Sequence, residues 1–218
     1  MKGSQISLEI DGQKVVAREG MTILEVARDM GIEVPTLCHH EALSPYGACR
    51  LCTVEVERNG STRMVTSCNY PVADGLVVRT NSPKVRKLRK GILELLLPVA
   101  PCRAIQELAE EYGAKESRFV ADQATYCVLC GLCVRYCAEV KQVHAIGFVG
   151  RGTERRVAFF PEIAQQECMS CRECFGLCPT GKLAAETDGV CFDGISIDDI
   201  LMVPEPAAKE GGLATLKT

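Results

Sequence analysis

The chain has 218 residues, a formal net charge of −3 and 47% hydrophobic residues. These values fit a globular protein of one or two domains, and the charge excludes a basic field for nucleic acid. The unusual feature is cysteine, with 14 residues. No apolar leader follows Met1, and no apolar run reaches the roughly 18 residues of a membrane helix. We therefore expect a cytoplasmic protein without direct membrane insertion, whose cysteines are metal ligands and not disulfides.

The first segment, residues 4–31, is predicted to form a hairpin followed by a helix. Alternating apolar residues flank Asp11 and Gly12, and this dipeptide is a strong hairpin signal. Thr22 is a good helix N-cap, and Glu25 three residues later completes a capping box. A hairpin followed by a helix is the opening of a β-grasp domain.

Four cysteines in the next segment have the topology of a plant-type [2Fe–2S] site. One precedes a loop, a C-x2-C pair lies within it, and the fourth follows a hairpin turned at Asn59 and Gly60. Gly47 and Ala48 suit a loop whose backbone must approach the cluster sulfides closely. We therefore predict a [2Fe–2S] cluster bound by Cys38, Cys49, Cys52 and Cys68.

Two alternatives remain open for this segment. A C-x2-C pair also occurs as half of a zinc site. His39 and His40 directly follow Cys38 and suggest a Rieske-type centre, but such a centre needs two separated His-containing motifs. We favour histidines that form hydrogen bonds with the loop or with solvent.

Residues 82–113 are predicted to form two helices, the second spanning 104–112. Ser82 begins the first, and Pro83 takes its first helical position, where proline is tolerated. The basic face of this helix is interpreted as solvated, with docking of an acidic partner subunit as the alternative. The apolar stripe consists of Val85, Leu88, Ile92 and Leu95 or Leu96. The basic face consists of Lys84, Arg86, Lys87, Arg89 and Lys90.

The most specific motif lies at residues 127–178, where the spacing C-x2-C-x2-C-x3-C occurs twice. This is the bacterial ferredoxin run for [4Fe–4S] clusters, in which the fourth cysteine of each run ligates the other cluster. Zinc sites usually use two C-x2-C pairs, and disulfides do not suit a reducing compartment. We predict a first cubane on Cys127, Cys130, Cys133 and Cys178, and a second on Cys137, Cys168, Cys171 and Cys174.

Between the two runs, residues 138–167 are predicted to be an insertion with strands at 145–150 and 156–160. The last residues are rich in Pro, Gly, Ala and charge, and are predicted to form a tail that is mobile or orders on a partner. The fold class is α+β. The predicted divisions are a β-grasp [2Fe–2S] domain at 1–81, a helical linker at 82–120, a two-[4Fe–4S] ferredoxin domain at 121–200 and the tail at 201–218.

The order of these parts resembles the iron–sulfur electron-transfer subunits of NAD-linked hydrogenases and NAD-dependent formate dehydrogenases. It is also similar to the N-terminal part of the 75-kDa subunit of respiratory complex I and to the iron-only hydrogenases. The resemblance rests on VPTLCHHEALSPYGACRLCTVEV, LELLLPVAPCRAIQELAEEYG, CVLCGLCVRYCAEV and CMSCRECFGLCPTGKL. It implies partners: a flavin- and NAD(P)-binding diaphorase-type subunit, a catalytic hydrogenase or formate dehydrogenase subunit, and ferredoxin as a further candidate.

The linker departs from the family pattern. Members usually carry H-x3-C-x2-C-x5-C there, which binds a third [4Fe–4S] cluster through one His and three Cys. Residues 98–107 contain no His and a single cysteine, Cys102. We therefore expect that cluster to be absent and Cys102 to be a remnant or an ordinary buried cysteine. Cys191 is interpreted as a structural cysteine, and Ala138 stands where simple ferredoxins have Pro, a change that the family tolerates.

No motif for catalysis is present: there is no G-x-G-x-x-G loop, no GK[ST] loop and no Ser/His/Asp set. The iron-only hydrogenases extend this architecture with a catalytic domain, whereas this chain ends, so we expect catalysis on partner chains. We predict a non-catalytic subunit of a multisubunit, NAD(P)-linked complex that relays single electrons, and the missing linker cluster suggests electron bifurcation. The alternatives are a free-standing soluble polyferredoxin and a zinc-bound structural or interaction protein.

Overall fold

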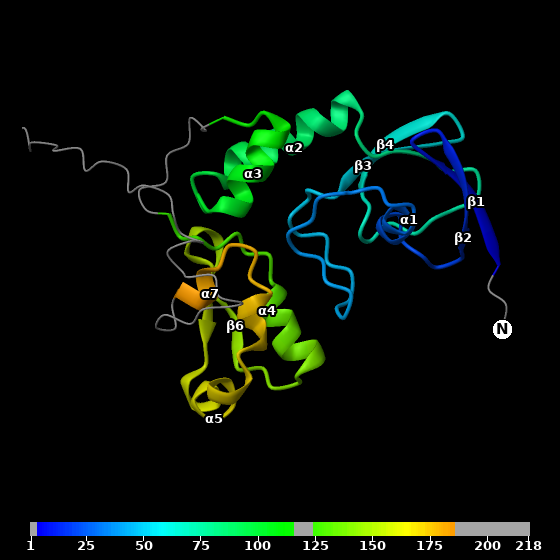
Figure 1. Ribbon diagram of the computed structural model, residues 1–218. Helices are drawn as coiled ribbons and strands as arrows, with labels where there is room; N and C mark the ends of the chain where they lie inside the picture. The colour runs from blue at the N-terminus through cyan, green and yellow to red at the C-terminus, as the bar shows by residue number, and fades with distance from the viewer. Residues whose placement is uncertain (1–3, 116–123, 186–218) are drawn as a thin grey trace, which may run out of the picture.

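The computed structural model describes residues 4–115 and 124–185 (Figure 1). Within them the first part of the chain forms a five-stranded sheet in the order β2-β1-β5-β3-β4. Strands β1 and β5 pair in parallel, and the other neighbours pair antiparallel. The strands are β1 (Gln5–Ile10), β2 (Gln13–Arg18), β3 (Thr53–Arg58), β4 (Ser61–Thr66) and β5 (Val77–Arg79).

Both predicted hairpins are confirmed, and their turns explain the sequence at these positions. Asp11 and Gly12 have φ of 48° and 82°, and Asn59 and Gly60 have φ of 51° and 74°. Positive φ at both central residues is the type I′ turn, which matches the twist of two-residue hairpins and favours Asp-Gly and Asn-Gly.

Helix α1 (Ile23–Asp29) follows the first hairpin and shares one buried cluster with the sheet. The predicted capping box is present: the Glu25 N–H donates to Thr22 Oγ1 at 3.3 Å, and the Thr22 N–H donates to Glu25 Oε2 at 2.6 Å. Ile10 from the sheet and Ile23 from the helix are both 0% exposed in this cluster. Hairpin, helix and mixed sheet together confirm the α+β class.

Helices α2 (Pro83–Leu96) and α3 (Arg103–Tyr112) confirm the two predicted helices. The N-cap Ser82 accepts a hydrogen bond from the Val85 N–H at 3.4 Å, and Gly113 ends α3 with a φ of 65°. The pair encloses a second buried cluster that also takes in part of the loop between α1 and β3. Its fully or nearly fully buried members are Leu37, Leu51, Leu93, Ala100, Cys102, Ile105, Ala109 and Tyr112.

The predicted faces of α2 are wrong in one respect, because Arg89 belongs to the buried face. Arg89 is 1% exposed and lies on one line with the buried Val85 and Leu93, at i, i+4 spacing. Of the two alternatives for the last position of the apolar stripe, Leu95 is 54% exposed and Leu96 is partly buried. The pattern of apolar residues alone placed the arginine outside, whereas tertiary hydrogen bonds hold it inside.

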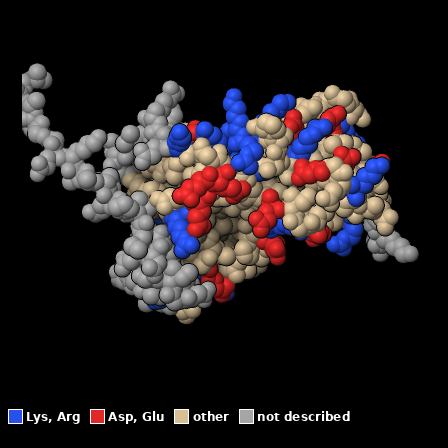
Figure 2. Space-filling view, turned by 45° about the horizontal axis from the view of Figure 1, so that its top comes forward, with Lys and Arg blue, Asp and Glu red and all other residues tan. Residues whose placement is uncertain are grey.

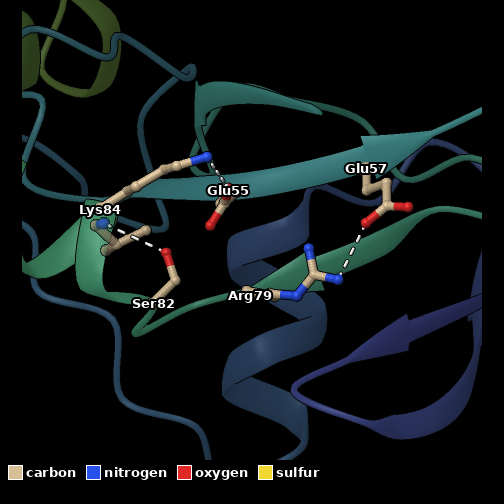
Figure 3. A network of polar contacts seen from close by, with 6 residues as sticks. Glu55, Glu57, Arg79, Ser82 and Lys84 are labelled. Atoms are coloured by element: carbon tan, nitrogen blue, oxygen red, sulfur yellow. Dashed lines mark hydrogen bonds and ion pairs between the residues drawn. The ribbon is translucent and has the colours of Figure 1, made fainter. Parts of the chain in front are cut away.

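The remaining basic residues of α2 are engaged mostly within the molecule. Lys84 forms an ion pair with Glu55 of β3 at 3.2 Å, beside the pair of Arg79 with Glu57 at 3.0 Å (Figure 3). Lys90 pairs with Glu94 one turn later at 3.8 Å. Lys and Arg side chains are interspersed with Asp and Glu over the face that Figure 2 shows.

The second part of the chain begins with α4 (Leu132–Arg135), which continues into a π-turn, η1 (Tyr136–Val140). The predicted insertion does contain two strands, which pair antiparallel. Ala145, Ile146, Phe175 and Leu183 are the apolar members of the buried cluster in this part. The other elements are β6 (Ile146–Val149), η2 (Gly152–Glu154), β7 (Arg156–Phe159), α5 (Pro161–Cys171), α6 (Glu173–Gly176) and α7 (Lys182–Ala185).

The predicted tail at 201–218 and Cys191 lie outside the described residues. No helix in the described part of the chain has the length and apolar character needed to cross a membrane.

Candidate metal centres

The four cysteines predicted for the [2Fe–2S] site form two sulfur pairs: Cys38, Cys49 and Cys52 lie in the loop between α1 and β3, and Cys68 follows β4. The Cys49 N–H donates to the Cys38 sulfur at 3.3 Å, and the Leu37 N–H donates to the Cys49 sulfur at 3.4 Å. Cys52 and Cys68 form the second pair and share a side-chain hydrogen bond. Two thiolates per iron is the arrangement that a planar [2Fe–2S] cluster requires.

Within each pair the two sulfurs have pKa values shifted in opposite directions. The hydrogen bond from the Cys38 side chain lowers the pKa of Cys49 to about 6, and backbone N–H groups add to this effect. The hydrogen bond from Cys68 likewise lowers the pKa of Cys52 to about 7. The pKa values of Cys38 and Cys68 are raised, first by donating these bonds and then by burial. Backbone donors aimed at sulfur are what a negatively charged cluster needs.

The loop that carries these cysteines leaves no room for a side chain at Gly47. Its φ is 71°, and a Cβ there would lie 2.8 Å from Nδ2 of Asn69. Asn69 is itself fixed by the Thr66 hydroxyl, which donates to its Oδ1 at 2.5 Å. Gly47 therefore approaches Asn69 closely, and the predicted approach of this loop to cluster sulfides stays a prediction.

Two histidines follow Cys38, and one of them forms a hydrogen bond within the loop. His40 Nδ1 accepts a hydrogen bond from the Ala42 N–H at 3.1 Å, and its ring meets the Tyr136 ring edge-on at 5.8 Å between centroids. Burial lowers the pKa of His39, which favours the neutral imidazole. His40 thus forms the loop hydrogen bond that the preferred interpretation predicts.

The eight cysteines of the double run are sorted into two cavities. Each cavity takes three cysteines from one run and the fourth from the other. A small cavity of about 20 Å³ is lined by Cys127, Cys130, Cys133 and Cys178. A larger cavity of about 280 Å³ is lined by Cys137, Cys168, Cys171 and Cys174. The structure therefore brings together the two sets that the crossed pattern predicts.

Left-handed residues turn the chain between the cysteines of each run. Gly131, with a φ of 76°, precedes α4, so that the chain reverses between Cys130 and Cys133. Arg172, with a φ of 50°, separates α5 from α6 and has the same effect before Cys174. These turns let three sulfurs of one run face a common centre.

Burial raises the pKa of Cys130, Cys133, Cys168 and Cys174 in the double run. It raises the pKa of Cys130 to about 12, with a further increase from the nearby Cys178, and it also raises the pKa of Cys174 to about 12. The pKa of Cys133 is raised by burial and then by Cys130, and Cys174 of the other set also contributes. The two sets are therefore neighbours, and metal binding must displace their protons.

Polar groups reach two sulfurs of the double run as well. The Ala145 N–H donates to the Cys137 sulfur at 3.2 Å, whereas the Thr180 hydroxyl, 3.4 Å from the Cys178 sulfur, donates to the Tyr126 carbonyl. Two cavities that are each lined by four cysteines, with a backbone N–H donating to one of the sulfurs, fit thiolate-ligated iron–sulfur clusters. Among residues 4–115 and 124–185, no group of three or more His, Cys, Asp and Glu could hold a single metal ion.

Cys102 stands apart from these sets. It is the N-cap of α3, is 1% exposed, and lies in the buried cluster of α2 and α3 with Leu93 and Ile105. Burial raises its pKa. This is the ordinary buried cysteine that the sequence predicts as one of two possibilities.

A polar contact that sequence reasoning missed joins the two parts of the chain. Arg135 Nε donates to Glu139 Oε1 at 2.9 Å, and Nη2 donates to the Ser44 carbonyl. The Ser44 N–H donates to Glu139 Oε2 at 2.9 Å, and the Arg135 guanidinium lies 4.8 Å from the centroid of the Tyr46 ring. We call these four residues the latch. The i, i+4 spacing of Arg135 and Glu139 predicts their ion pair, but no pattern predicts its partner loop.

Beneath the latch the two parts share a small apolar core. Cys38 and Leu43 come from the loop between α1 and β3, and Cys130 and Leu132 come from the first cysteine run. Figure 1 shows this loop reaching out from the sheet towards α4. The latch and the apolar core place the [2Fe–2S] loop directly beside the first cavity.

Family models match both parts. One described as a 2Fe-2S iron-sulfur cluster binding domain matches residues 3–83, and one described as a 4Fe-4S dicluster domain matches residues 126–182. The chain thus contains a [2Fe–2S] ferredoxin domain followed by a [4Fe–4S] dicluster domain, as predicted. The fold class is confirmed in this finer form.

Three curated proteins are similar to 83% of this chain at 34% identity. They are the NADH-ubiquinone oxidoreductase 75 kDa subunit of Reclinomonas americana, the NADPH-Fe(3+) oxidoreductase subunit alpha of Geobacter sulfurreducens and the NADP-reducing hydrogenase subunit HndD of Solidesulfovibrio fructosivorans. The chain spans only 29%, 24% and 36% of their respective lengths.

The chain spans a larger share of one solved structure. It is a chain from the crystal structure of an NAD+-reducing [NiFe]-hydrogenase in the H2-reduced state, with a TM-score of 0.62 and 30% sequence identity. The match covers 72% of this chain and 75% of that chain. On these similarities, the chain belongs to the family of iron–sulfur electron-transfer subunits of NAD(P)-linked hydrogenases and oxidoreductases.

Proposed function

We propose that this chain is a non-catalytic subunit that relays single electrons through one [2Fe–2S] and two [4Fe–4S] clusters. The observation that carries the proposal is the sorting of the double run into two four-cysteine cavities beside the [2Fe–2S] loop. The proposed [2Fe–2S] ligands are Cys38, Cys49, Cys52 and Cys68. The proposed [4Fe–4S] ligands are Cys127, Cys130, Cys133 and Cys178 for the first cubane, and Cys137, Cys168, Cys171 and Cys174 for the second.

The proposed order of electron transfer is based on which cysteine sets are neighbours in the structure. Cys38 and Cys130 belong to the same small group of buried side chains, which supports a step between the [2Fe–2S] centre and the first cubane. The effect of Cys174 on the pKa of Cys133 supports a step between the two cubanes. Three of the four cysteines of the larger cavity are partly exposed (Cys168, Cys171 and Cys174), against two of the smaller cavity (Cys127 and Cys178), and we assign the larger cavity to the end that faces a partner. When bound, the clusters supply one-electron redox chemistry, and the chain holds and insulates them.

The partners are proposed from the relatives. A flavin- and NAD(P)-binding subunit would exchange electrons at one end, and a catalytic hydrogenase or formate dehydrogenase subunit at the other, with the dicluster domain towards the catalytic subunit. One relative is a subunit of an NADP-reducing hydrogenase, and the solved structure is of an NAD+-reducing [NiFe]-hydrogenase. Both favour a hydrogenase over a formate dehydrogenase as the catalytic partner. We also propose a cytoplasmic location and the domain boundaries 81, 120 and 200. No disulfide joins the cysteines in the described part of the chain, which suits a reducing compartment.

Anaerobic purification with metal analysis tests the cluster content. We expect about ten irons with matching acid-labile sulfide per chain, the sum of one two-iron and two four-iron clusters. Electron paramagnetic resonance (EPR) of the reduced protein should then show three centres. A colourless protein with zinc and no sulfide would support the structural alternative, and a fourth cluster signal would refute the absence of a linker cluster.

A second experiment tests the role as a subunit. Purified from its native host, the chain should elute in a complex, and NADH or NADPH should reduce its clusters only when the flavin-binding subunit is present. Elution as a lone monomer that accepts electrons from many donors would favour the free-standing polyferredoxin instead.

A further inference from the structure

Arg89 is a buried cation without a carboxylate partner. It is 1% exposed and is the largest of the fully buried side chains among the described residues. Its Nε donates to the Leu51 carbonyl at 2.9 Å, Nη2 donates to the Thr53 carbonyl at 3.0 Å, and Nη1 donates to the Tyr112 hydroxyl at 3.0 Å. In the part of the chain that the structure describes, Arg89 takes part in no ion pair.

Such a charge requires compensation. Removing a guanidinium from water is unfavourable unless an anion or a full set of hydrogen bonds replaces the lost hydration. Two carbonyls, a hydroxyl and the face of the Tyr112 ring, 5.4 Å from the Arg89 Cζ, offset part of this loss. None of these groups carries a negative charge.

The hydrogen bonds place the Arg89 guanidinium next to the cysteines of the proposed [2Fe–2S] site. Leu51 and Thr53 are the residues on either side of Cys52, a proposed ligand of the [2Fe–2S] centre. Leu51 also lies next but one to Cys49, whose sulfur accepts a hydrogen bond from the Leu51 N–H. The guanidinium is therefore bound to the backbone of the C-x2-C loop itself. A [2Fe–2S] cluster with four thiolates is negative in both oxidation states and gains one more negative charge on reduction.

We propose that Arg89 is the fixed counter-charge of the [2Fe–2S] centre and raises its reduction potential by stabilising the reduced form. The inference rests on the proposed function, because it needs the cluster at Cys38, Cys49, Cys52 and Cys68. In the redox step the centre accepts one electron from the reduced preceding carrier, which is oxidised by one electron, and no bond is broken. Arg89 stays protonated throughout, so the step moves no proton.

The alternative is that Arg89 only fastens α2 to the loop. Substitutions separate the two roles, because R89K keeps the charge but loses the three-point geometry, whereas R89Q keeps an amide donor and loses the charge. R89M removes both. The matched control is R86Q: Arg86 lies on the same helix and over the same Tyr112 ring at 5.1 Å, but its side chain is exposed.

The experiment is an anaerobic redox titration of the holoprotein, followed by EPR of the [2Fe–2S] signal. We expect R89Q and R89M to lower the equilibrium constant for reduction about tenfold, which is about 59 mV for a one-electron couple. R89K should keep most of the wild-type potential, R86Q should match the wild type, and the cubane potentials should serve as an internal reference. Neutral variants that fail to retain the [2Fe–2S] cluster, while R89K retains it, would also support charge compensation.

The inference is overturned if R89K and R89M shift the potential equally, since hydrogen-bond geometry would then be the cause. It is also overturned if no variant shifts it, or if R89K loses the cluster together with the neutral variants. These failures differ from failure of the proposed function, which would show as a wild-type protein without any [2Fe–2S] signal.

Discussion

Arg135 donates a hydrogen bond to the backbone carbonyl of Ser44, which lies 91 residues earlier in the chain. Ser44 belongs to the loop between Cys38 and Cys49, and Arg135 belongs to the helix between Cys133 and Cys137. A single side chain therefore fixes the loop of one proposed centre against the ligand helix of the next. The Arg135 side chain is only 12% exposed, which distinguishes it from a surface ion pair.

We predict that R135A loosens this contact. Because the side chain is mostly buried and its hydrogen bonds involve a charged donor, the loss should be about 2–3 kcal/mol in the free energy of unfolding. Anaerobic urea unfolding of the holoprotein, followed by visible absorbance of the clusters, measures it. Intramolecular electron transfer from the [2Fe–2S] centre to the first cubane should slow in the same variant, because the two sites are held less closely.

R103A is the matched control for the latch. Arg103 and Glu107 form the same i, i+4 ion pair at 2.8 Å, but both side chains are largely exposed and make no contact with the other part of the chain in the structure. This variant should unfold almost as the wild type does. Equal effects of R135A and R103A would contradict a role for the latch.

Gly47 should not tolerate alanine. A non-glycine residue at positive φ costs about 1–2 kcal/mol, and the added Cβ would also meet Asn69 at 2.8 Å. We expect G47A to lose the [2Fe–2S] EPR signal faster than the wild type on air exposure and to unfold at a lower temperature. G60A is the control, because its φ of 74° imposes the same backbone strain but nothing lies within 4 Å of the new Cβ. If G47A and G60A behave alike, crowding against Asn69 has no effect.

Substitution of the fourth cysteine of each run tests the crossed ligation. C137S should remove the cubane otherwise held by Cys168, Cys171 and Cys174, and C178S should remove the one held by the first run. Each variant should lose about four irons, because serine does not replace a thiolate in the cluster. Iron analysis combined with EPR identifies which signal disappears. C102S, changed at a buried cysteine outside both sets, should keep all its iron. Loss of the Cys127 cluster in C137S would show that each run holds its own cluster.

Glu55 predicts a pH dependence of stability. Ser82 and Lys84 hold the pKa of this carboxyl below its ordinary value of 4.5, and Figure 3 shows the ion pair with Lys84. A folded-state pKa below the unfolded one adds stability above pH 4.5, and this stability is lost as the pH falls through the folded pKa. The melting temperature of E55Q should therefore lie below that of the wild type at pH 7, and the difference should shrink as the pH falls below 4.5. A difference that stays constant over this range would contradict the assignment.

The secondary structure was largely predictable because its signals are local. Asp11 with Gly12 and Asn59 with Gly60 specify turns whose dihedral angles no other common dipeptide adopts as readily. Thr22 specifies the start of a helix through hydrogen bonds that span three residues. Each of these features is complete within a few residues, so the pattern in the sequence contains the whole interaction.

The cysteine sets were predictable for a related reason. The repeated spacing brings three sulfurs to one turn of the chain, and the structure places the fourth cysteine of the other run in the same cavity. That these residues bind iron remains a prediction. The environment of the sulfurs was not predictable, because Ala145 and Thr180 reach them only after the β6–β7 hairpin and the final turn have packed.

Arg89 and Ser44 could not be predicted from the sequence. An arginine in an amphipathic helix counts as polar, and only the carbonyls of Leu51 and Thr53 turn it inwards. Ser44 contributes backbone atoms alone, so any residue except proline could offer the same N–H and carbonyl to the latch. Contacts between distant segments that use backbone groups leave no trace in a single sequence.

Each of the two cavities takes cysteines from both runs, and this limits when the clusters can be assembled during synthesis of the chain. Neither cavity has its full cysteine set until the second run is synthesised: the larger is complete at Cys174 and the smaller at Cys178. The four cysteines from Cys38 to Cys68 lie well upstream, so the first domain can fold while translation continues. Both proposed cubanes can therefore be completed only after synthesis has reached the second run. A ribosome that stalls between residues 138 and 167 leaves a chain equipped for the [2Fe–2S] centre and unable to complete either cubane.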